Sequence, residues 1–347
     1  MPVQAQPATD APPSPWSAVA RAVALLTVAV SVLLTAFAWP SVRSSLHDVP
    51  IAVAGPAPAV KQISAALDER LPDAFDITEV ADTTAAEQLI RNRDVYGAID
   101  VSSSTPQVIL ASAASTAVAQ TLNNIATALS QPQSQGTSTG AAVRDLVPLP
   151  ADDPRGAGLA AAALPLVMGG LLAAFLLTRL ILGTTRRVIG ALAFAVTGGL
   201  ALTAILQFWL GSLTGSYWAN TGAVALTIAA TSLTILGLES VLGYTGLGLG
   251  AATMMLIGNP LSGTATAPEM LPGWSGTLGQ LLPPGAGGRL LRSTAFFDSH
   301  GATHSLIVLA TWLTLGILLC LASGLRPRRL AADPVTTTAQ PAAKATV

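Results

Sequence analysis

Long apolar segments and one long polar stretch alternate along this chain. An apolar segment covers residues 19–39, a polar stretch covers residues 41–155, and further apolar segments follow. The later segments lie at residues 158–177, 188–210, 219–238, 241–257 and 306–325. Because about 20 apolar residues cross a bilayer as an α-helix, the pattern predicts a membrane protein. We expect an all-α bundle of six transmembrane helices, with a soluble domain inserted between the first and second helices.

The composition supports a membrane protein. Charged residues make up 10% of the chain and the mean hydropathy is +0.59, whereas soluble proteins contain about 25% charged residues. The net charge of -1 gives no reason to expect a nucleic-acid partner. Lys61 and Lys344 are the only lysines, which together with abundant Ala, Gly and Pro indicates a GC-rich bacterial genome. A single cysteine, Cys320, excludes an intrachain disulfide.

Arginines set the expected orientation, because cytoplasmic ends of membrane helices collect Lys and Arg. Arg21 precedes the apolar run of the first segment. Arg179, Arg186 and Arg187 lie between the second and third segments, and Arg326, Arg328 and Arg329 follow the last. Six crossings of the cell membrane then leave residues 1–18 and 326–347 as disordered cytoplasmic tails. Residues 41–155 become an extracytoplasmic domain.

Some arginines depart from this scheme. Arg43 and Arg155 flank external ends of helices, and Arg289 and Arg292 lie in the long external segment, residues 259–303. We expect Arg292 to anchor this segment structurally; pairing with Asp298 or with a lipid phosphate is the alternative.

The first apolar segment allows two interpretations. Ala36-Phe37-Ala38 resembles a signal-peptidase site, and cleavage there would leave five helices. The apolar run over residues 22–38 is long for a signal peptide, and Pro40 follows it closely. A retained anchor is therefore favoured, and both interpretations keep the polar domain outside.

The polar stretch alternates between strand and helix patterns, which predicts an α/β domain. Apolar residues at every second position predict strands near residues 51–53, 75–77, 96–101, 107–110 and 143–147. Apolar residues three and four apart predict helices over residues 60–71 and 118–129. Thr84 and Glu87 fit a capping box for a further helix through Ile90. Residues 131–140 have the composition of a linker.

The membrane half is rich in glycine. Gly246-Leu-Gly248-Leu-Gly250 superficially suggests a nucleotide loop, but it lies in an apolar run, so close helix packing is favoured. The chain contains no Gly-x-x-x-x-Gly-Lys-Ser/Thr pattern. If ATP drives this protein, another chain binds it.

The segment over residues 259–303 carries the sharpest local signal. Its marker residues are Asn259, Pro260, Gly263, Pro272, Pro283, Pro284 and Arg292. Pro and Gly at this density stop helices, yet Met270, Leu271 and Trp274 are interleaved with them. The pattern favours short amphipathic helices that re-enter the outer leaflet. An ordinary external loop with a few apolar contacts is the alternative.

With these pieces the chain resembles the permeases of type 2 ABC exporters, in the bacterial, actinobacterial branch similar to phage-infection proteins. The resemblance rests on the inserted domain with Asp94-Val95-Tyr96-Gly97-Ala98-Ile99, the break at Asn259-Pro260-Leu261-Ser262-Gly263, and the loop over residues 271–292. It implies six helices per subunit, a homodimer or heterodimer, and a separate ATP-binding subunit. Residues 179–189 would be the coupling segment that this subunit contacts.

Further candidate residues have two interpretations each. Arg186 and Arg187 fit positive-inside anchors, or a docking site for the partner. Glu239 would cost about 2.5 to 3.5 kcal/mol at a helix centre, so an interfacial turn is favoured over a proton or cation relay. His300 and His304 fit loop histidines better than a metal site.

We therefore expect a permease subunit of an ABC-type exporter that moves a hydrophobic or amphipathic substrate, in contact with membrane lipid and without a cofactor. The alternative is a membrane-anchored binding or envelope-assembly protein whose external domain recognises a ligand without transport. An enzyme ranks third, because the sequence has no Ser/His/Asp set, carboxylate pair or metal cluster.

Overall fold

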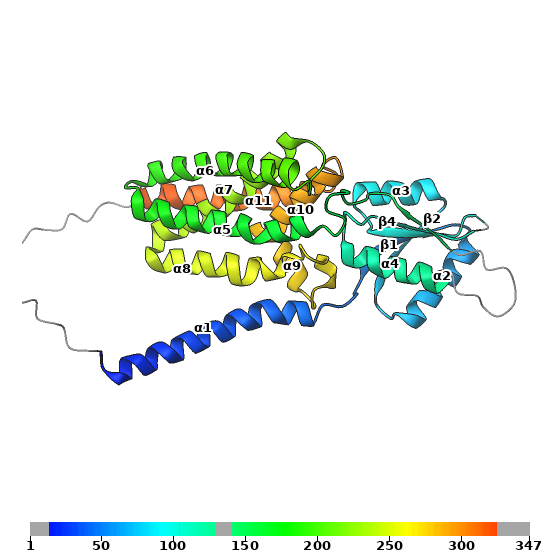
Figure 1. Cartoon of the computed structure of the whole chain (residues 1–347), viewed down its shortest axis with the longest axis horizontal. Coiled ribbons are helices and arrows are strands. Elements are labelled where there is room, and N and C mark those ends of the chain that lie inside the picture. Colours follow the sequence, from blue (N-terminus) through cyan, green and yellow to red (C-terminus); the bar gives the residue numbers. More distant parts are fainter. Residues whose placement is uncertain (1–13, 104, 130–140, 325–347) are drawn as a thin grey trace, which may run out of the picture.

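The computed structural model describes residues 14–103, 105–129 and 141–324, and these are mostly helical (Figure 1). Within them, five helices are long and apolar enough to cross a membrane. They are α1 (Trp16–Val42), α5 (Ala157–Leu180), α6 (Thr184–Ala204) with its continuation η1 (Ile205–Trp209), α7 (Tyr217–Leu242) and α11 (Thr303–Gly324). The chain is therefore a membrane-embedded protein. The predicted linker and carboxyl-terminal tail lie outside the described residues, as do residues 1–13 of the predicted amino-terminal tail. Trp16, Ser17 and Ala18, which were expected in that tail, belong to α1.

The predicted fifth segment is shorter than a full span. Helix α7 extends to Leu242, and Gly243 then breaks the chain at a φ of 66°. The following helix, α8 (Tyr244–Ala252), continues as η2 (Thr253–Gly258). Its 15 residues rise about 22 Å at 1.5 Å per residue, less than the hydrocarbon core of about 30 Å. By length, the described chain has five spans where the sequence predicts six.

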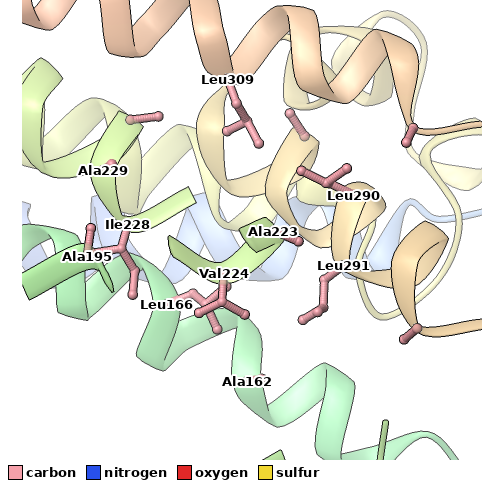
Figure 2. Close-up of a cluster of buried hydrophobic side chains, with 14 of the residues drawn as sticks. Ala162, Leu166, Ala195, Ala223, Val224, Ile228, Ala229, Leu290, Leu291 and Leu309 are labelled. Atoms are coloured by element: carbon pink, nitrogen blue, oxygen red, sulfur yellow. The ribbon is translucent and has the colours of Figure 1, made fainter. Parts of the chain in front are cut away.

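Helix α7 forms the centre of the bundle, and 78% of the residues in its most apolar 18-residue stretch are buried. It packs against α5, α6, α8, α11 and the shorter helix α10 (Pro283–Phe296). Figure 2 shows side chains from these helices gathered in one cluster, among them Leu166, Val224, Ile228, Leu290, Leu291 and Leu309. A helix that is apolar all round fits such a central position.

Helix α1 differs from the others, because it stands apart from the bundle (Figure 1). No residue in its most apolar 18-residue stretch is buried, and Pro40 near its carboxyl end is the only buried residue of the helix. It meets the rest of the membrane half near its carboxyl end, at η2 and at η3 (Pro260–Ser262). Its apolar surface is therefore exposed along most of the helix.

Between α1 and α5 the chain forms a five-stranded sheet with helices on both faces, here called the α/β unit. Its elements are β1 (Val49–Ala54), α2 (Ala57–Arg70), β2 (Phe75–Val80), α3 (Thr83–Asn92), β3 (Gly97–Asp100), β4 (Gln107–Leu110), α4 (Thr116–Leu129) and β5 (Ala142–Asp145). The strand order is β2-β1-β3-β4-β5, and only the β3/β4 pair is antiparallel. Each element lies where the sequence pattern predicts one.

Successive side chains of each strand point to opposite faces of this sheet. Val49 and Ile51 pack with α2 and α4, whereas Ala52 and Ala54 pack with α3. Small residues on the second face let α3 approach the sheet closely. The period-2 pattern of the sequence thus fixes which helix covers which face.

The predicted capping box of α3 is wrong. Asp82 is the N-cap, and its carboxylate accepts the Ala85 N–H at 2.8 Å. Thr84 lies inside the first turn, and Glu87 pairs with Arg144 of β5. An aspartate caps as well as a threonine, so the helix starts two residues earlier than the box requires.

The segment over residues 259–303 is a set of short helices. They are η3, η4 (Pro268–Met270), α9 (Ser275–Gln280) and α10, and all except α9 begin with proline. Most residues of α10 are buried, and α10 packs against α7 and α11. The ordinary-loop interpretation is therefore wrong, since α10 belongs to the core of the bundle.

Candidate functional site

The α/β unit rests on the segment over residues 259–303, at one end of the helical bundle (Figure 1). The Ser45 N–H donates to the Met270 carbonyl at 3.0 Å, and the Ser115 hydroxyl donates to the Thr266 carbonyl at 2.8 Å. Phe297, just after α10, is buried among side chains of α3 and the sheet. The two halves of the molecule therefore share a packed, hydrogen-bonded junction.

Arg93 ties α3 to α10 at this junction. It ends α3 with a φ of 65°, which turns the chain into the short connection before β3. Its guanidinium donates to the Arg289 carbonyl at 3.1 Å and to the Ser293 hydroxyl at 2.5 Å. The same group lies 5.0 Å from the centre of the Phe297 ring, a cation–π distance.

Five further polar side chains surround Arg93, and together the six form what we call the junction site. Its members are Arg93, Tyr96, Glu269, Gln280, Arg289 and Arg292, of which all but Glu269 line one narrow cavity. The Tyr96 hydroxyl donates to the Glu269 carboxylate at 2.7 Å. Arg292 donates through Nη2 to the Thr264 carbonyl at 3.0 Å.

The charges of the junction site do not balance. Three guanidinium groups face one carboxylate, and that carboxylate is hydrogen-bonded to Tyr96. None of the ion pairs within the described residues involves these three arginines. Like charges at close range in a poorly hydrated site repel strongly, so the site carries uncompensated positive charge.

The pKa shifts at the junction site reflect this imbalance. Burial, and then the positive charges of Arg292 and Arg289, lower the pKa of Arg93 to about 9. Burial also lowers the pKa of Arg292. Burial and the neighbouring Glu269 raise the pKa of Tyr96, which keeps its hydroxyl protonated as a donor. A bound anion would relieve the penalty on both arginines.

Three polar atoms at the junction site lack a partner. Nε of Arg289, Nε of Arg292 and Oε1 of Gln280 are out of contact with solvent and form no hydrogen bond within the described structure. Gln280 itself is 6% exposed, and its amide nitrogen donates to the Ser262 carbonyl at 2.7 Å. Buried polar atoms are normally satisfied, so these donors and this acceptor mark a place for another molecule.

Two larger cavities share lining residues with the narrow cavity of the junction site. The narrow cavity has a volume of about 10 Å³, room for about one water molecule. A cavity of about 400 Å³ adjoins it and shares Pro268, Gln280 and Arg289 as lining. A third, of about 220 Å³, lies between α1 and α5 and shares Ser262, Gly263 and Thr264 with the narrow cavity.

The candidate arginines at the opposite end of the bundle have different surroundings. Arg187 binds both carboxylate oxygens of Glu239, at 3.0 and 3.2 Å. It also donates to the carbonyls of Ile181 and Thr178, at 2.8 and 3.1 Å, and so caps the carboxyl end of α5. Glu239 lies in the last turn of α7 rather than in a turn between helices. Arg187 is thus engaged within the chain.

Arg179 and Arg186 remain on the surface. The Arg179 guanidinium lies 5.5 Å from the Phe175 ring and 5.3 Å from the Tyr244 ring, which links α5 to α8. The connection between α5 and α6 contains only residues 181–183. A partner at this end would therefore contact helix ends and Arg186.

The marker residues of the segment over residues 259–303 shape its turns. Pro260 starts η3, Gly263 has a φ of 64°, and the Pro272 carbonyl accepts hydrogen bonds from Ser275. Pro283 and Pro284 occupy the first turn of α10, where a proline leaves no hydrogen bond unmade. The Asn259 carbonyl accepts bonds from Ser262. These residues position α10 and its arginines.

Arg292 donates to the Thr264 carbonyl within this segment, which fits the expected anchoring role. The alternative of a pair with Asp298 is wrong, because no ion pair joins the two residues and Asp298 is exposed at a φ of 46°. The Nδ1–H of His300 donates to the Phe297 carbonyl at 2.8 Å. Among the described residues, no three His, Cys, Asp or Glu side chains could hold a metal ion together.

No family model, curated protein or solved structure matches this chain.

The sequence singles out two of the six residues of the junction site. Arg289 and Arg292 stood out because they break the positive-inside pattern. Arg93 gave no signal, since it is separated by 196 positions from Arg289, whose carbonyl it contacts. Tyr96 was assigned to the apolar pattern of a strand, yet it lies just before β3 and its hydroxyl reaches Glu269.

Proposed function

We propose that this protein is the membrane-spanning permease subunit of an ABC-type exporter in the cell membrane. It moves an amphipathic substrate with energy from a separate ATP-binding subunit, and it acts as a homodimer or heterodimer. In this proposal α8 and η2 form most of a sixth crossing. The short helix η3 continues it, and because its residues are buried in protein its backbone is not exposed to lipid. Both termini are then cytoplasmic and the α/β unit is extracytoplasmic.

The observation that carries the proposal is the position of the junction site. It lies beneath the α/β unit, next to a cavity between the membrane helices α1 and α5, and next to a larger cavity lined by His47, Asp48 and His304. A molecule with an apolar part and a charged part could contact both surroundings. Such a site suits the step in which an amphiphile passes between the bilayer and the external side.

Transport can be tested on the complex purified from native membranes through a tag on this chain. We expect an ATP-hydrolysing subunit to co-purify, and its ATPase rate to rise when a dihexanoyl phospholipid is added. Arg186→Glu should reduce co-purification, because Arg186 is exposed at the end of the bundle away from the α/β unit. Arg155→Glu, an exposed arginine on the other side of the bundle, is the matched control. A preparation without any ATPase would contradict the proposal.

The binding-protein alternative also has an observation in its favour. Arg187 is fully engaged within the chain, and the connection of residues 181–183 offers little surface to a partner. Reconstituted vesicles distinguish the two functions. A transporter accelerates the movement of a fluorescent phospholipid between leaflets with ATP, whereas a membrane-anchored binding protein retains ligand binding without any movement.

A further inference from the structure

We infer that the junction site binds the phosphate group of an anionic phospholipid, with Arg93, Arg289 and Arg292 as its positive charges and Gln280 as an acceptor for a headgroup hydroxyl. This inference deepens the proposed function by naming the class of its ligand. It concerns binding alone, and the isolated chain can be tested for it without an ATPase.

The charge of the site argues for an anion from outside the chain. Three arginines converge on a cavity, and no ion pair within the described residues neutralises them. A single water molecule would fill the narrow cavity and satisfy the free Nε groups, but it brings no charge. Burying unpaired guanidinium groups is costly, and phosphate is an anion whose geometry a guanidinium group matches with paired hydrogen bonds.

The shape of the site admits a phosphate group. The narrow cavity of about 10 Å³ has room for one phosphate oxygen, within reach of the site's unpartnered donors. The rest of the group fits the adjoining cavity of about 400 Å³, which Arg289 also lines. Gln280 lines both cavities, and its free Oε1 can accept a hydrogen bond from a hydroxyl of the ligand.

The depth of the site argues for a lipid as the source of the phosphate. His47 and Asp48 follow the end of α1, and His304 is the second residue of α11. The large cavity therefore lies where two spanning helices end, at the level of the lipid headgroups. The third cavity, between α1 and α5 and lined by Phe37, Ala160 and Leu164, offers an apolar surface beside the narrow cavity.

Thermal unfolding of the full chain in detergent tests this inference with three probes. They are dihexanoyl phosphatidylglycerol, dihexanoyl phosphatidylcholine and inorganic phosphate. We expect a saturable rise of the unfolding temperature with phosphatidylglycerol and none with phosphatidylcholine, whose choline neutralises the headgroup. A comparable rise with inorganic phosphate would also support the phosphate site and would identify free phosphate as the source.

Variants assign the effect to these arginines. Arg289→Gln should weaken phosphatidylglycerol binding about tenfold, because one charge-assisted hydrogen-bond partner is lost, and Arg289→Lys should recover part of it. Arg289 is partly exposed, so its replacement leaves the fold intact; Arg292→Gln is the second test. Arg186→Gln, at the opposite end, should bind like the wild type. No rise with any probe, equal rises with both lipids, or undiminished binding in both glutamine variants would overturn the inference.

Discussion

At the scale of residues, arginine serves two purposes in this protein. Arg187 is neutralised by Glu239, and the two side chains are only 18% and 13% exposed. The arginines of the junction site, in contrast, have no acidic partner within the described residues. One end of the bundle therefore uses an ion pair to hold helices together, while the other keeps positive charge available.

The ion pair at the first end should matter for stability. Arg187→Gln leaves Glu239 as a buried carboxylate without a partner and removes the cap of α5, which should cost about 3 to 5 kcal/mol of unfolding free energy. Replacing both residues by glutamine should cost less than the sum of the single changes. Unfolding in mixed micelles measures these differences in unfolding free energy, with Arg186→Gln as the exposed control. A strictly additive double variant would mean that the pair contributes nothing.

The lowered pKa of Arg93 predicts a pH dependence. Below pH 9 Arg93 is protonated in both the folded and the unfolded chain, and the folded state carries the full penalty. Between the folded pKa of about 9 and the higher pKa of an arginine in the unfolded chain, the folded chain holds fewer protons, so stability rises with pH. For one proton the slope is at most about 1.4 kcal/mol per pH unit.

The measurement compares the wild type with Arg93→Gln between pH 8 and pH 10. The difference in unfolding temperature should shift in favour of the wild type as pH rises. The charged or titratable groups around Arg93 are Arg289, Arg292, Tyr96 and Glu269, and Tyr96 stays protonated because its pKa is raised. Phosphatidylglycerol should suppress the shift, since a bound anion favours protonated Arg93. A difference independent of pH would refute the assignment.

At the scale of elements, α8 depends on glycines for its place against α7. A Cβ at Gly246 would collide with the Leu238 carbonyl, whereas a Cβ at Gly248 would meet nothing within 4 Å. Gly246→Val should therefore destabilise the protein by about 1 to 3 kcal/mol through overpacking. Gly248→Val is a matched control on the same helix, with the same change in propensity. Equal losses in unfolding temperature for both variants would contradict this packing.

The elements were predictable wherever one residue period dominates. The strands and helices of the α/β unit follow clear periods of 2 and 3.6, and the long apolar helices follow from length. The sequence was least specific at α10, because two prolines and three glycines in 14 residues fit a loop as well as a short helix. Tertiary packing against α7 and α11 stabilises this helix despite its composition.

The charged contacts were less predictable than the elements. Glu239 was expected in a turn because an unpaired charge is costly inside a helix, but Arg187 on a different helix removes that cost. Arg93 and Tyr96 reach the junction through contacts of 196 and 173 positions in sequence. Such pairs depend on how the two halves dock, and no local period encodes this.

At the scale of the whole molecule, the arrangement of helices predicts the topology in the membrane. Helix α11 runs from the junction toward the end of the bundle where α1 begins (Figure 1). A tag at Gln135, between α4 and β5, and a tag at Gln340, beyond α11, should therefore be accessible on opposite faces. Labelling of intact and permeabilised cells measures this. Labelling of both tags in intact cells would contradict a spanning α11.

The isolation of α1 has a consequence for how its sequence can change. Most α1 side chains fit against no neighbour within the chain, so exchanges among leucine, valine, isoleucine and phenylalanine should be tolerated along most of this helix. In α7 the same exchanges alter volume inside a crowded centre and are selected against. Neutral substitutions should therefore vary the sequence of α1 while its hydrophobicity is maintained, and the sequence of α7 should change little.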